Sequence, residues 1–491
     1  MRVRGALVLL VLSSIACDPE VACDAASLRT ALAAASPGDE VELHCRVEGA
    51  FVVPAGVTLT GTGDATIALT GADAVALEVM TGDQGATVVQ GLTVESAGRA
   101  GIAVRGAGAA VLDRTVVRAT AGVGVGTGGA TVTIRASTIE GEVTPDTIDD
   151  SRWLRVIGSA PPDGECPTAE CECRPGARDG SRTCDTTGRW ATLTATHGLY
   201  VRGGTLELVD TTITQHALFA VVLEDTSATI AGGTIGHGLG VGLEVLGGTV
   251  AIEGTEITGV HTGLRGSPSY AALFADDAAA TTTGLLVRGV DGYGLVHAGG
   301  TGVHQGLVIE ETGDVALWAG GSERVEVRGP GARIADAAFA AVLGVEVGAL
   351  RLEDVDVVGV RALRRVVGAR GAIDVGDGVQ LIATVPSLEA VRIVGAERAG
   401  LVVDLVSGVD ATAFREVSVD ASGTALGAIA GTVDVATEAL VAGAPAGWDT
   451  GVTRAGAAAA NDAAFAGALP AVVAATPPSA GSVVGAIGPM Y

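Results

Sequence analysis

Side chains able to transfer protons are few in this sequence, and they are scattered. Two acidic pairs, Asp149-Asp150 and Asp276-Asp277, could act as acid and base, because cleavage of a glycosidic bond requires two carboxylates placed across it. Both pairs fall in stretches that we expect to be irregular insertions. His237 stands between two glycines, where an imidazole is typical of a polar corner rather than of a catalytic pair. We therefore assign no catalytic residue.

The basic side chains are all arginines, since the sequence contains no lysine. The one basic cluster consists of Arg361, Arg364, Arg365 and Arg370. A lyase would need such a base beside carboxylates that hold Ca²⁺, but no regular series of acidic residues faces this cluster. A solvated face or a local ion-pair region explains it better. Dispersed carboxylates leave Ca²⁺ binding open without specifying a site, and we expect no other cofactor.

Other kinds of site are also incomplete. The sequence has no Gly-x-Ser-x-Gly elbow for a nucleophilic serine, and Cys171-x-Cys173 lacks the usual spacing of zinc ligands. Sugar-binding surfaces generally rely on exposed aromatic rings. The plausible candidates for that role are Trp153, Trp190, Tyr200, Tyr270 and Trp318. The candidate ligand-binding residues are Trp153, Trp190, Asp149, Asp150 and His237.

The elements that would position these residues repeat every 22 residues between His197 and Gly259. Leu199, Val221 and Leu243 occupy one apolar column, and four more columns keep the same register. A period of this size marks a solenoid, whose units bury their apolar faces only by stacking on one another. The other columns are Val201, Leu223 and Val245; Leu206, Ala228 and Val250; Leu208, Ile230 and Ile252; and Ile213, Ile235 and Ile257.

Each repeat is predicted to consist of strands. Apolar residues alternate two apart, as Leu206 and Leu208 do, which is the side-chain period of a strand. Paired glycines such as Gly203-Gly204 and Gly232-Gly233 separate the short runs and suit the corners between strands. We therefore predict an all-β chain in which each repeat is one coil of a parallel β-helix, or β-solenoid.

Composition agrees with stacked coils. The 491 residues include 74 glycines, and only 3% are aromatic. Small and aliphatic side chains can fill a narrow bore at every level, where bulky rings would clash with the next coil. The formal net charge of −26 repels phosphate backbones, so no nucleic-acid partner is expected.

The first residues predict export. Residues 1–16 have the charge and apolar run of a secretory signal peptide. The run Ser14-Ile15-Ala16-Cys17 resembles a bacterial lipobox, although Ser14 stands where that family usually has leucine. The resemblance implies a lipid on Cys17, which would anchor the chain at the cell envelope, on the outer membrane or cell surface. The alternative is ordinary cleavage with Cys17 in a disulfide, and no later stretch predicts a spanning helix.

Seven cysteines fit an exported chain. If Cys17 carries a lipid, six cysteines remain, and they can pair in an oxidising compartment. Cys23 and Cys45 most simply pair with each other. The other four allow three pairings, and the sequence does not choose among them: Cys166, Cys171, Cys173 and Cys184.

Residues 17–46 are predicted to form the anchor and an N-terminal cap. A short helix is expected over 24–36, with Asp24 as its N-cap, and it would protect the edge and core of the first coil. The run SLRTALAAASPGDEVEL, followed by FVVPAGVTLTGTG, resembles the opening of right-handed parallel β-helix proteins of the pectate-lyase-like superfamily. The resemblance implies a right-handed coil over 47–141 and again over 197–442.

Residues 142–196 interrupt the repeat. Only about ten residues are needed to reach the next strand, so the remainder must leave the coil as a loop. The run CRPGARDGSRTCDTTGRW resembles small disulfide-bearing segments of secreted bacterial proteins. Two interpretations are open. The segment is a tolerated insertion held by disulfides, or it is a projecting recognition lobe.

The rest of the chain is predicted to continue the solenoid after a second irregular loop over 266–283. At about 22 residues per coil, the chain would form about 15 coils and a rod about 70 Å long. The Ala- and Pro-rich segment 443–491 ends in VVGAIGP, which resembles the closing stretch of related β-helices. We predict that it is a C-terminal cover.

Gly236-His237-Gly238 matches one short motif of the polygalacturonase family, whose catalysis also needs a set of carboxylates and an Arg-x-Lys element. The sequence has neither an Asn-Thr-Asp motif nor a lysine. The leading hypothesis is therefore a non-catalytic, lipid-anchored scaffold, adhesin or recognition protein, with the membrane and a glycan or surface protein as partners. The alternatives on the same fold are a polysaccharide lyase or glycoside hydrolase, and a carbohydrate-binding protein.

Overall fold

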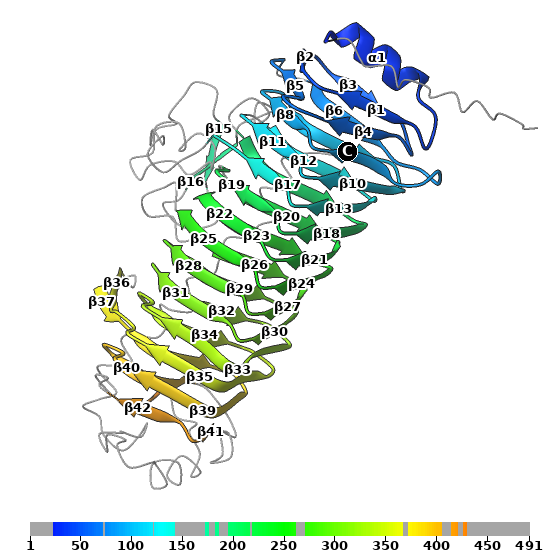
Figure 1. Ribbon diagram of the computed structural model, residues 1–491. Coiled ribbons are helices and arrows are strands. Elements are labelled where there is room, and N and C mark those ends of the chain that lie inside the picture. The colour runs from blue at the N-terminus through cyan, green and yellow to red at the C-terminus, as the bar shows by residue number, and fades with distance from the viewer. Residues whose placement is uncertain are drawn as a thin grey trace, which may run out of the picture.

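The chain folds as a right-handed parallel β-helix with strands stacked into one elongated rod, as the repeat and the resemblance predicted (Figure 1). Described strands of this solenoid lie in both of the segments for which the sequence predicts it, 47–141 and 197–442. The computed structural model describes residues 23–71, 74–120, 122–142, 172–175, 182–185, 195–216, 219–261, 271–366, 372–404, 414–420 and 426–429.

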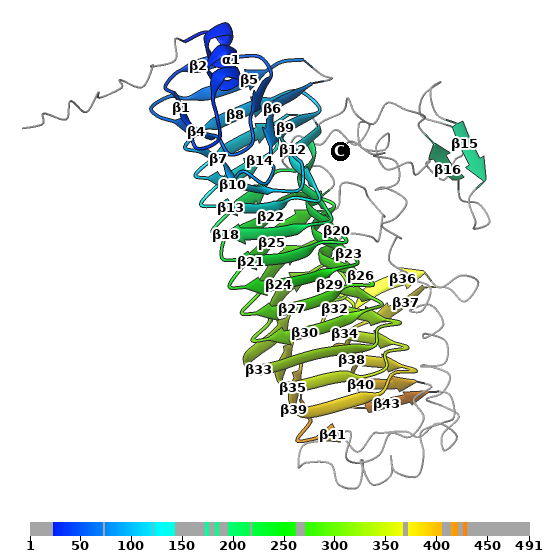
Figure 2. The same ribbon diagram turned by 90° about the vertical axis from the view of Figure 1, so that its right-hand side faces the viewer.

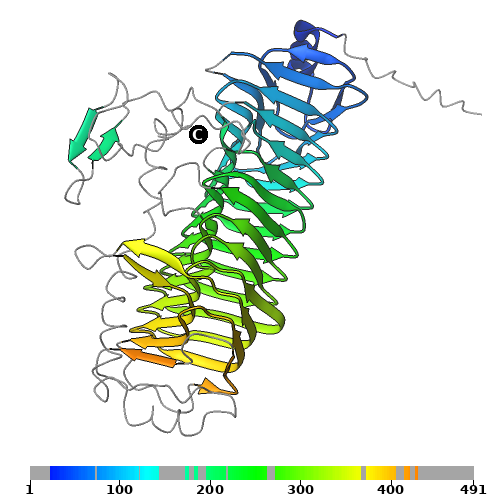
Figure 3. The same ribbon diagram turned by 90° about the vertical axis from the view of Figure 1, so that its left-hand side faces the viewer.

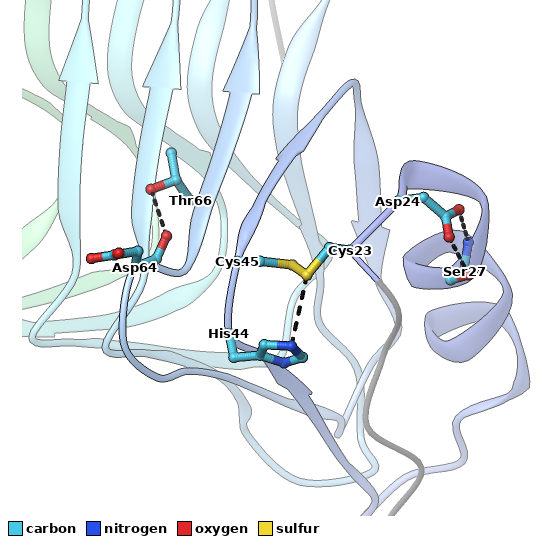
Figure 4. Close-up of a disulfide and its surroundings, with 7 residues drawn as sticks. All are labelled: Cys23, Asp24, Ser27, His44, Cys45, Asp64 and Thr66. Carbon is cyan, nitrogen blue, oxygen red and sulfur yellow. Dashed lines mark hydrogen bonds between the residues drawn. A yellow bond between two sulfur atoms is a disulfide. The ribbon is translucent and has the colours of Figure 1, made fainter.

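The helix α1, Ala25–Ala34, packs on the N-terminal end of the rod. The Asp24 carboxylate accepts hydrogen bonds from the backbone N–H and the hydroxyl of Ser27, at 2.8 and 2.7 Å (Figure 4). These bonds lower the pKa of Asp24, because they stabilise the ionised form. Leu28 and Leu32 are buried at the end of the solenoid core. The predicted capping helix is confirmed, and it ends at Ala34 rather than at Ser36.

Two long parallel sheets make up the rod, and Figure 2 shows it turned by 90°. The 14-stranded sheet contains β3 (Phe51–Val53), β6 (Val75–Met80), β9 (Ala100–Arg105), β12 (Gly122–Gly128), β17 (Ala195–Arg202), β20 (Phe219–Glu224), β23 (Val241–Leu246), β26 (Ala271–Asp276), β29 (Tyr293–Ala298), β32 (Leu317–Gly320), β34 (Ala340–Val345), β38 (Asp377–Ile382), β40 (Ala399–Asp404) and β43 (Leu426–Ile429). At about 4.8 Å between strands, this sheet is roughly 60 Å long.

The 25-stranded sheet forms the other walls of the coils. It contains β1 (Glu40–Leu43), β2 (Arg46–Glu48), β4 (Thr58–Gly61), β5 (Thr66–Leu69), β7 (Thr87–Gln90), β8 (Thr93–Ser96), β10 (Ala109–Asp113), β11 (Val116–Ala119), β13 (Thr131–Arg135), β14 (Thr138–Glu140), β18 (Thr205–Val209), β19 (Thr212–Thr214), β21 (Ser227–Ala231), β22 (Thr234–Leu239), β24 (Thr249–Glu253), β25 (Glu256–His261), β27 (Ala279–Thr283), β28 (Leu286–Val290), β30 (Thr301–Gln305), β31 (Val308–Thr312), β33 (Arg324–Ala335), β35 (Leu350–Val358), β39 (Pro386–Val394), β41 (Phe414–Arg415) and β42 (Ser418–Asp420).

The five apolar columns predicted from the 22-residue repeat are confirmed. Leu199 pairs with Val221, and Val221 with Leu243, in neighbouring strands. The other columns keep the predicted register as well. Leu243 is fully buried in the cluster that fills the bore. The repeat therefore encodes the core of the rod.

The solenoid keeps its register across the insertion that follows Glu142. Val125 of β12 pairs with Leu199 of β17, and Ile139 of β14 pairs with Ile213 of β19. Coils on the two sides of the insertion are therefore direct neighbours. Within the insertion, β15 (Glu172–Pro175) and β16 (Arg182–Asp185) pair as an antiparallel hairpin.

Two sequence-based expectations for the second half need correction. The rod resumes at Ala271 with β26 and β27, so the expected irregular loop over 266–283 is wrong beyond residue 270, and Asp276 ends a regular strand. The second expectation is that the chain continues as parallel coils through 363–375. Here β36 (Leu363–Val366) and β37 (Ala372–Val375) instead form an antiparallel hairpin, yellow in Figure 3.

No described helix is long and apolar enough to cross a membrane.

Candidate functional site

A hollow of about 440 Å³ lies on the rod where the chain enters the insertion. Its polar side chains come from β11, β14 and the corners that follow β11, β14 and β19. Carboxylate, guanidinium, hydroxyl and amide groups are all present in its lining. It is lined by Arg118, Ala119, Thr120, Glu140, Gly141, Glu142 and Gln215.

The charged side chains of the hollow are aligned by strand register. Arg118 of β11 lies opposite Glu95 of β8 on one side and Glu140 of β14 on the other. Its guanidinium is 3.5 Å from a carboxylate oxygen of each. Glu95 also accepts a hydrogen bond from Arg46, at 2.8 Å. Since side chains on a parallel sheet repeat at the strand spacing, Glu95, Arg118 and Glu140 of three successive coils form a ladder of alternating charge.

This ladder is open to solvent, with 54% of the Arg118 side chain and 36% of Glu140 exposed. Ion pairs of this kind contribute about 0–1 kcal/mol to stability. A ligand could therefore replace them at little cost to the fold. Glu142 adds a further carboxylate to the hollow. The hollow therefore contains two acidic side chains, Glu140 and Glu142, and one basic side chain, Arg118.

The rim of the hollow is held by a close backbone contact. Gly141 donates its N–H to the carbonyl oxygen of Thr214, at 2.9 Å. A Cβ atom at Gly141 would lie 2.0 Å from the carbonyl oxygen of Gln215. Gln215 itself has φ of +63°. Only glycine allows the coil to close this tightly before the insertion begins.

Two buried histidines lie beside the hollow. The Nε2 atom of His216 is 3.4 Å from the carbonyl oxygen of Ile139. Burial lowers the pKa of His216 to about 4. Burial and the nearby His216 lower the pKa of His197 to about 3, and the His197 ring stacks on Phe219 at 5.2 Å. Both are neutral at physiological pH and belong to the core.

The predicted pairing of Cys23 with Cys45 is confirmed as a disulfide (Figure 4). Nε2 of His44 lies 3.7 Å from Sγ of Cys23. The three side chains are close enough together to hold a metal ion. The two sulfur atoms are bonded to each other, however, and a zinc ligand must be a thiolate. In this form the group is a covalent link between the cap and the first coil.

His237 is exposed at a corner of β22 and has φ of +48°. A Cβ atom on Gly259 would lie 2.8 Å from Nδ1 of His237, so the imidazole packs over the backbone of the next coil. It lies outside the hollow described above. The remaining predicted site residues, Cys17, Asp149, Asp150, Trp153, Cys166, Cys171 and Trp190, lie outside the described residues. Cys173 and Cys184 stand opposite each other in the β15–β16 register.

Sequence reasoning missed several buried polar groups. Nε2 of His297 lies 2.9 Å from Nε2 of His304, and Nδ1 of His304 lies 3.0 Å from the Thr282 hydroxyl. Glu244 is fully buried, and burial followed by the charge of Asp276 raises its pKa to about 8. The available signal was a polar residue at a strand position whose neighbours one coil away, Val222 and Phe274, are apolar.

No protein family and no curated protein matches the sequence. Solved structures with a similar fold include bacteriophage CBA120 tailspike protein 3, with a TM-score of 0.34, 9% identity and 81% of this chain covered. This chain spans 58% of the tailspike's length. The Yersinia enterocolitica family 28 exopolygalacturonase has a TM-score of 0.32 and 10% identity, with 84% of this chain and 75% of the enzyme covered. The A-module of the Azotobacter vinelandii mannuronan C-5 epimerase AlgE6 has a TM-score of 0.25 and 12% identity, with 83% of this chain and 94% of the A-module covered. Likeness at this level says nothing about activity.

Proposed function

We propose that this chain is an exported, lipid-anchored protein of the cell envelope, which recognises a glycan through residues 142–196 and the adjoining hollow and does not turn the glycan over. One observation carries the proposal: the coils on the two sides of the insertion are in direct register. The solenoid therefore closes without these residues, which leaves them available for a role other than packing.

The chemistry of the hollow favours a neutral, hydroxyl-rich ligand. Carboxylates such as Glu140 and Glu142 accept hydrogen bonds from sugar hydroxyls, and Arg118 donates them. An anionic polysaccharide would meet more acidic than basic groups here, on a chain whose net charge is −26. Trp153 and Trp190 in the insertion are the candidate stacking rings.

Binding of the full-length chain to a panel of neutral and acidic glycans tests this proposal. We expect Glu140→Gln to weaken binding of a neutral glycan about tenfold, because a hydrogen bond to a charged group is worth about 1.5 kcal/mol or more. Trp153→Ala and Trp190→Ala should also weaken it. Glu253→Gln, an exposed position on another coil, is the matched control. Glycan binding that none of the three site variants changes would contradict the proposed site. If the chain binds a surface protein and no glycan, the proposed ligand is wrong.

The hollow also supports a second candidate function. Glu140 and Glu142 are two carboxylates of one recess, with Arg118 beside them, which are residue types that a glycoside hydrolase or lyase requires. Turnover on a polysaccharide panel that is abolished by Glu140→Gln or Glu142→Gln would overturn the non-catalytic proposal. Absence of turnover together with binding would support it.

A further inference from the structure

The 14-stranded sheet has an apolar face that points away from the bore. Side chains alternate along a strand, so Val222 must point opposite to Val221 and Leu223, which fill the bore. Successive coils place further side chains in the same column as Val222. From β17 to β40 the column is Tyr200, Val222, Glu244, Phe274, Val296, Trp318, Leu343, Gln380 and Val402.

This column is buried within a single copy of the chain. Trp318 is 9% exposed and Phe274 is 5% exposed, while Val222 and Val296 are fully buried. The residues that cluster with them come from the strands of the same sheet, the residues leading into these strands, and the β36–β37 hairpin. The hairpin contributes Leu363 and Val375 near one end. Over the rest of the column, no other described element belongs to this cluster.

Two buried polar side chains in the column also lack partners. Neither carboxylate oxygen of Glu244 has a hydrogen-bond partner among the described residues, and neither side-chain atom of Gln380 has one. Both side chains are fully buried. A buried polar group without a partner is destabilising, because it has lost its hydrogen bonds to water and gained none in the protein. A covering chain would bring backbone N–H and C=O groups that can form hydrogen bonds with Glu244 and Gln380. Its backbone groups would in turn gain the partners that buried backbone groups need.

The C-terminal segment fits this face by length and by its point of departure. It comprises 62 residues, 430 through 491, and it follows β43, the last strand of this same sheet. An extended chain of this length reaches up to about 200 Å, several times the roughly 60 Å of the sheet.

Composition also favours the C-terminal segment over the insertion. The segment is rich in Ala and Val, and its charged residues are few: Asp434, Glu438, Asp449, Arg454 and Asp462. The insertion carries five charged residues between Asp146 and Arg155 alone. Charged side chains laid on an apolar column would lose hydration without gaining partners.

We propose that residues 430–491 bind along the outer face of the 14-stranded sheet and cover the column from Tyr200 to Val402. The segment is then a lateral cover that gives the sheet a second apolar layer, as parallel sheets generally have on both faces. The sequence predicts a C-terminal cover over 443–491 but no surface for it to bind.

Photo-crosslinking of the full-length chain tests the proposal directly. p-Benzoylphenylalanine is placed at Val222, Val296 or Leu343 on the column, and at Val303 on the outer side of β30 as the control. We expect intramolecular crosslinks from the three column positions to peptides within 430–491, and none to this segment from Val303. Crosslinks to 143–194, crosslinks between two copies, or no crosslink from any column position would overturn the proposal.

A cleavage experiment provides a second measurement. A protease site inserted after residue 430 of the full-length chain allows the segment to be cut while it is in place. We expect the cut segment to co-elute with the rod, and Trp318→Arg to weaken its retention at least tenfold. Val385→Asp, at a side chain that is 60% exposed, should leave retention unchanged. Release of the segment from the wild-type rod on cleavage would contradict the proposal.

Discussion

Glu244 offers the sharpest test of the energetics of this fold. It is a carboxylic acid held in an apolar column between Val222 and Phe274, with both oxygens unpartnered among the described residues. Burial raises its pKa to about 8 in the folded chain, from 4.5. Between these two values the folded chain binds a proton that the unfolded chain releases. The contribution of Glu244 to the free energy of unfolding must therefore fall as the pH rises from about 4.5 to about 8.

The size of the effect follows from the two pKa values. At about 1.36 kcal/mol per pH unit, the free energy of unfolding falls by up to about 5 kcal/mol between pH 4.5 and pH 8. The Glu244→Gln variant keeps the shape of the protonated acid and cannot ionise. We expect its free energy of unfolding to match that of the wild type near pH 4.5 and to exceed it by a few kcal/mol at pH 8.

Urea unfolding of both proteins at pH 5 and pH 8 measures this difference. Glu253→Gln, at an exposed position of β24, is the matched control and should change stability by less than about 0.5 kcal/mol at either pH. The reasoning is refuted if Glu244→Gln is no more stable than the wild type at pH 8, or if the difference between them is the same at both pH values.

Other predictions test the core, the insertion, the buried histidines and the anchor. Leu243→Asp should lose at least 1.5–3 kcal/mol, roughly the burial energy of a leucine, as measured by urea unfolding, whereas Ala251→Asp on the outer side of β24 should be tolerated. Deletion of 144–194 should leave the melting transition of the rod in place, and a globally unfolded product would assign the insertion to the core. Burial lowers the pKa of His297 to about 4, so stability should fall as the pH drops from 6.5 to 4, and His297→Gln should reduce that slope. Cys17→Ser should release the chain from membranes, and unchanged partitioning would rule out the lipid anchor.

Much of the rod could be predicted because its information is local and periodic. The columns through Leu199 and Leu208 repeat at the strand period and at the coil period, and both periods follow from backbone geometry. Asp24 could be assigned as an N-cap, and Cys23 could be paired with Cys45, for similarly local reasons. These features are visible in a linear sequence because neighbouring coils are a constant number of residues apart.

The hollow could not be found in this way, because it depends on contacts without a fixed period. Arg118 meets Glu95 and Glu140 through register, but Gln215 joins them only because the coils on either side of a long insertion stack directly. The outer apolar column was hidden for another reason. Residues such as Val222 and Phe274 look like ordinary strand residues until the structure shows that the bore is already filled by the residues beside them.

Sequence periodicity was thus sufficient for the architecture, since a solenoid repeats the same burial pattern at every level. The tertiary structure alone decided which polar residues share a surface and which face of the 14-stranded sheet requires a cover. Those properties depend on the direction of side chains and on the coil to which an insertion returns, and neither is written in the spacing of residues along the chain.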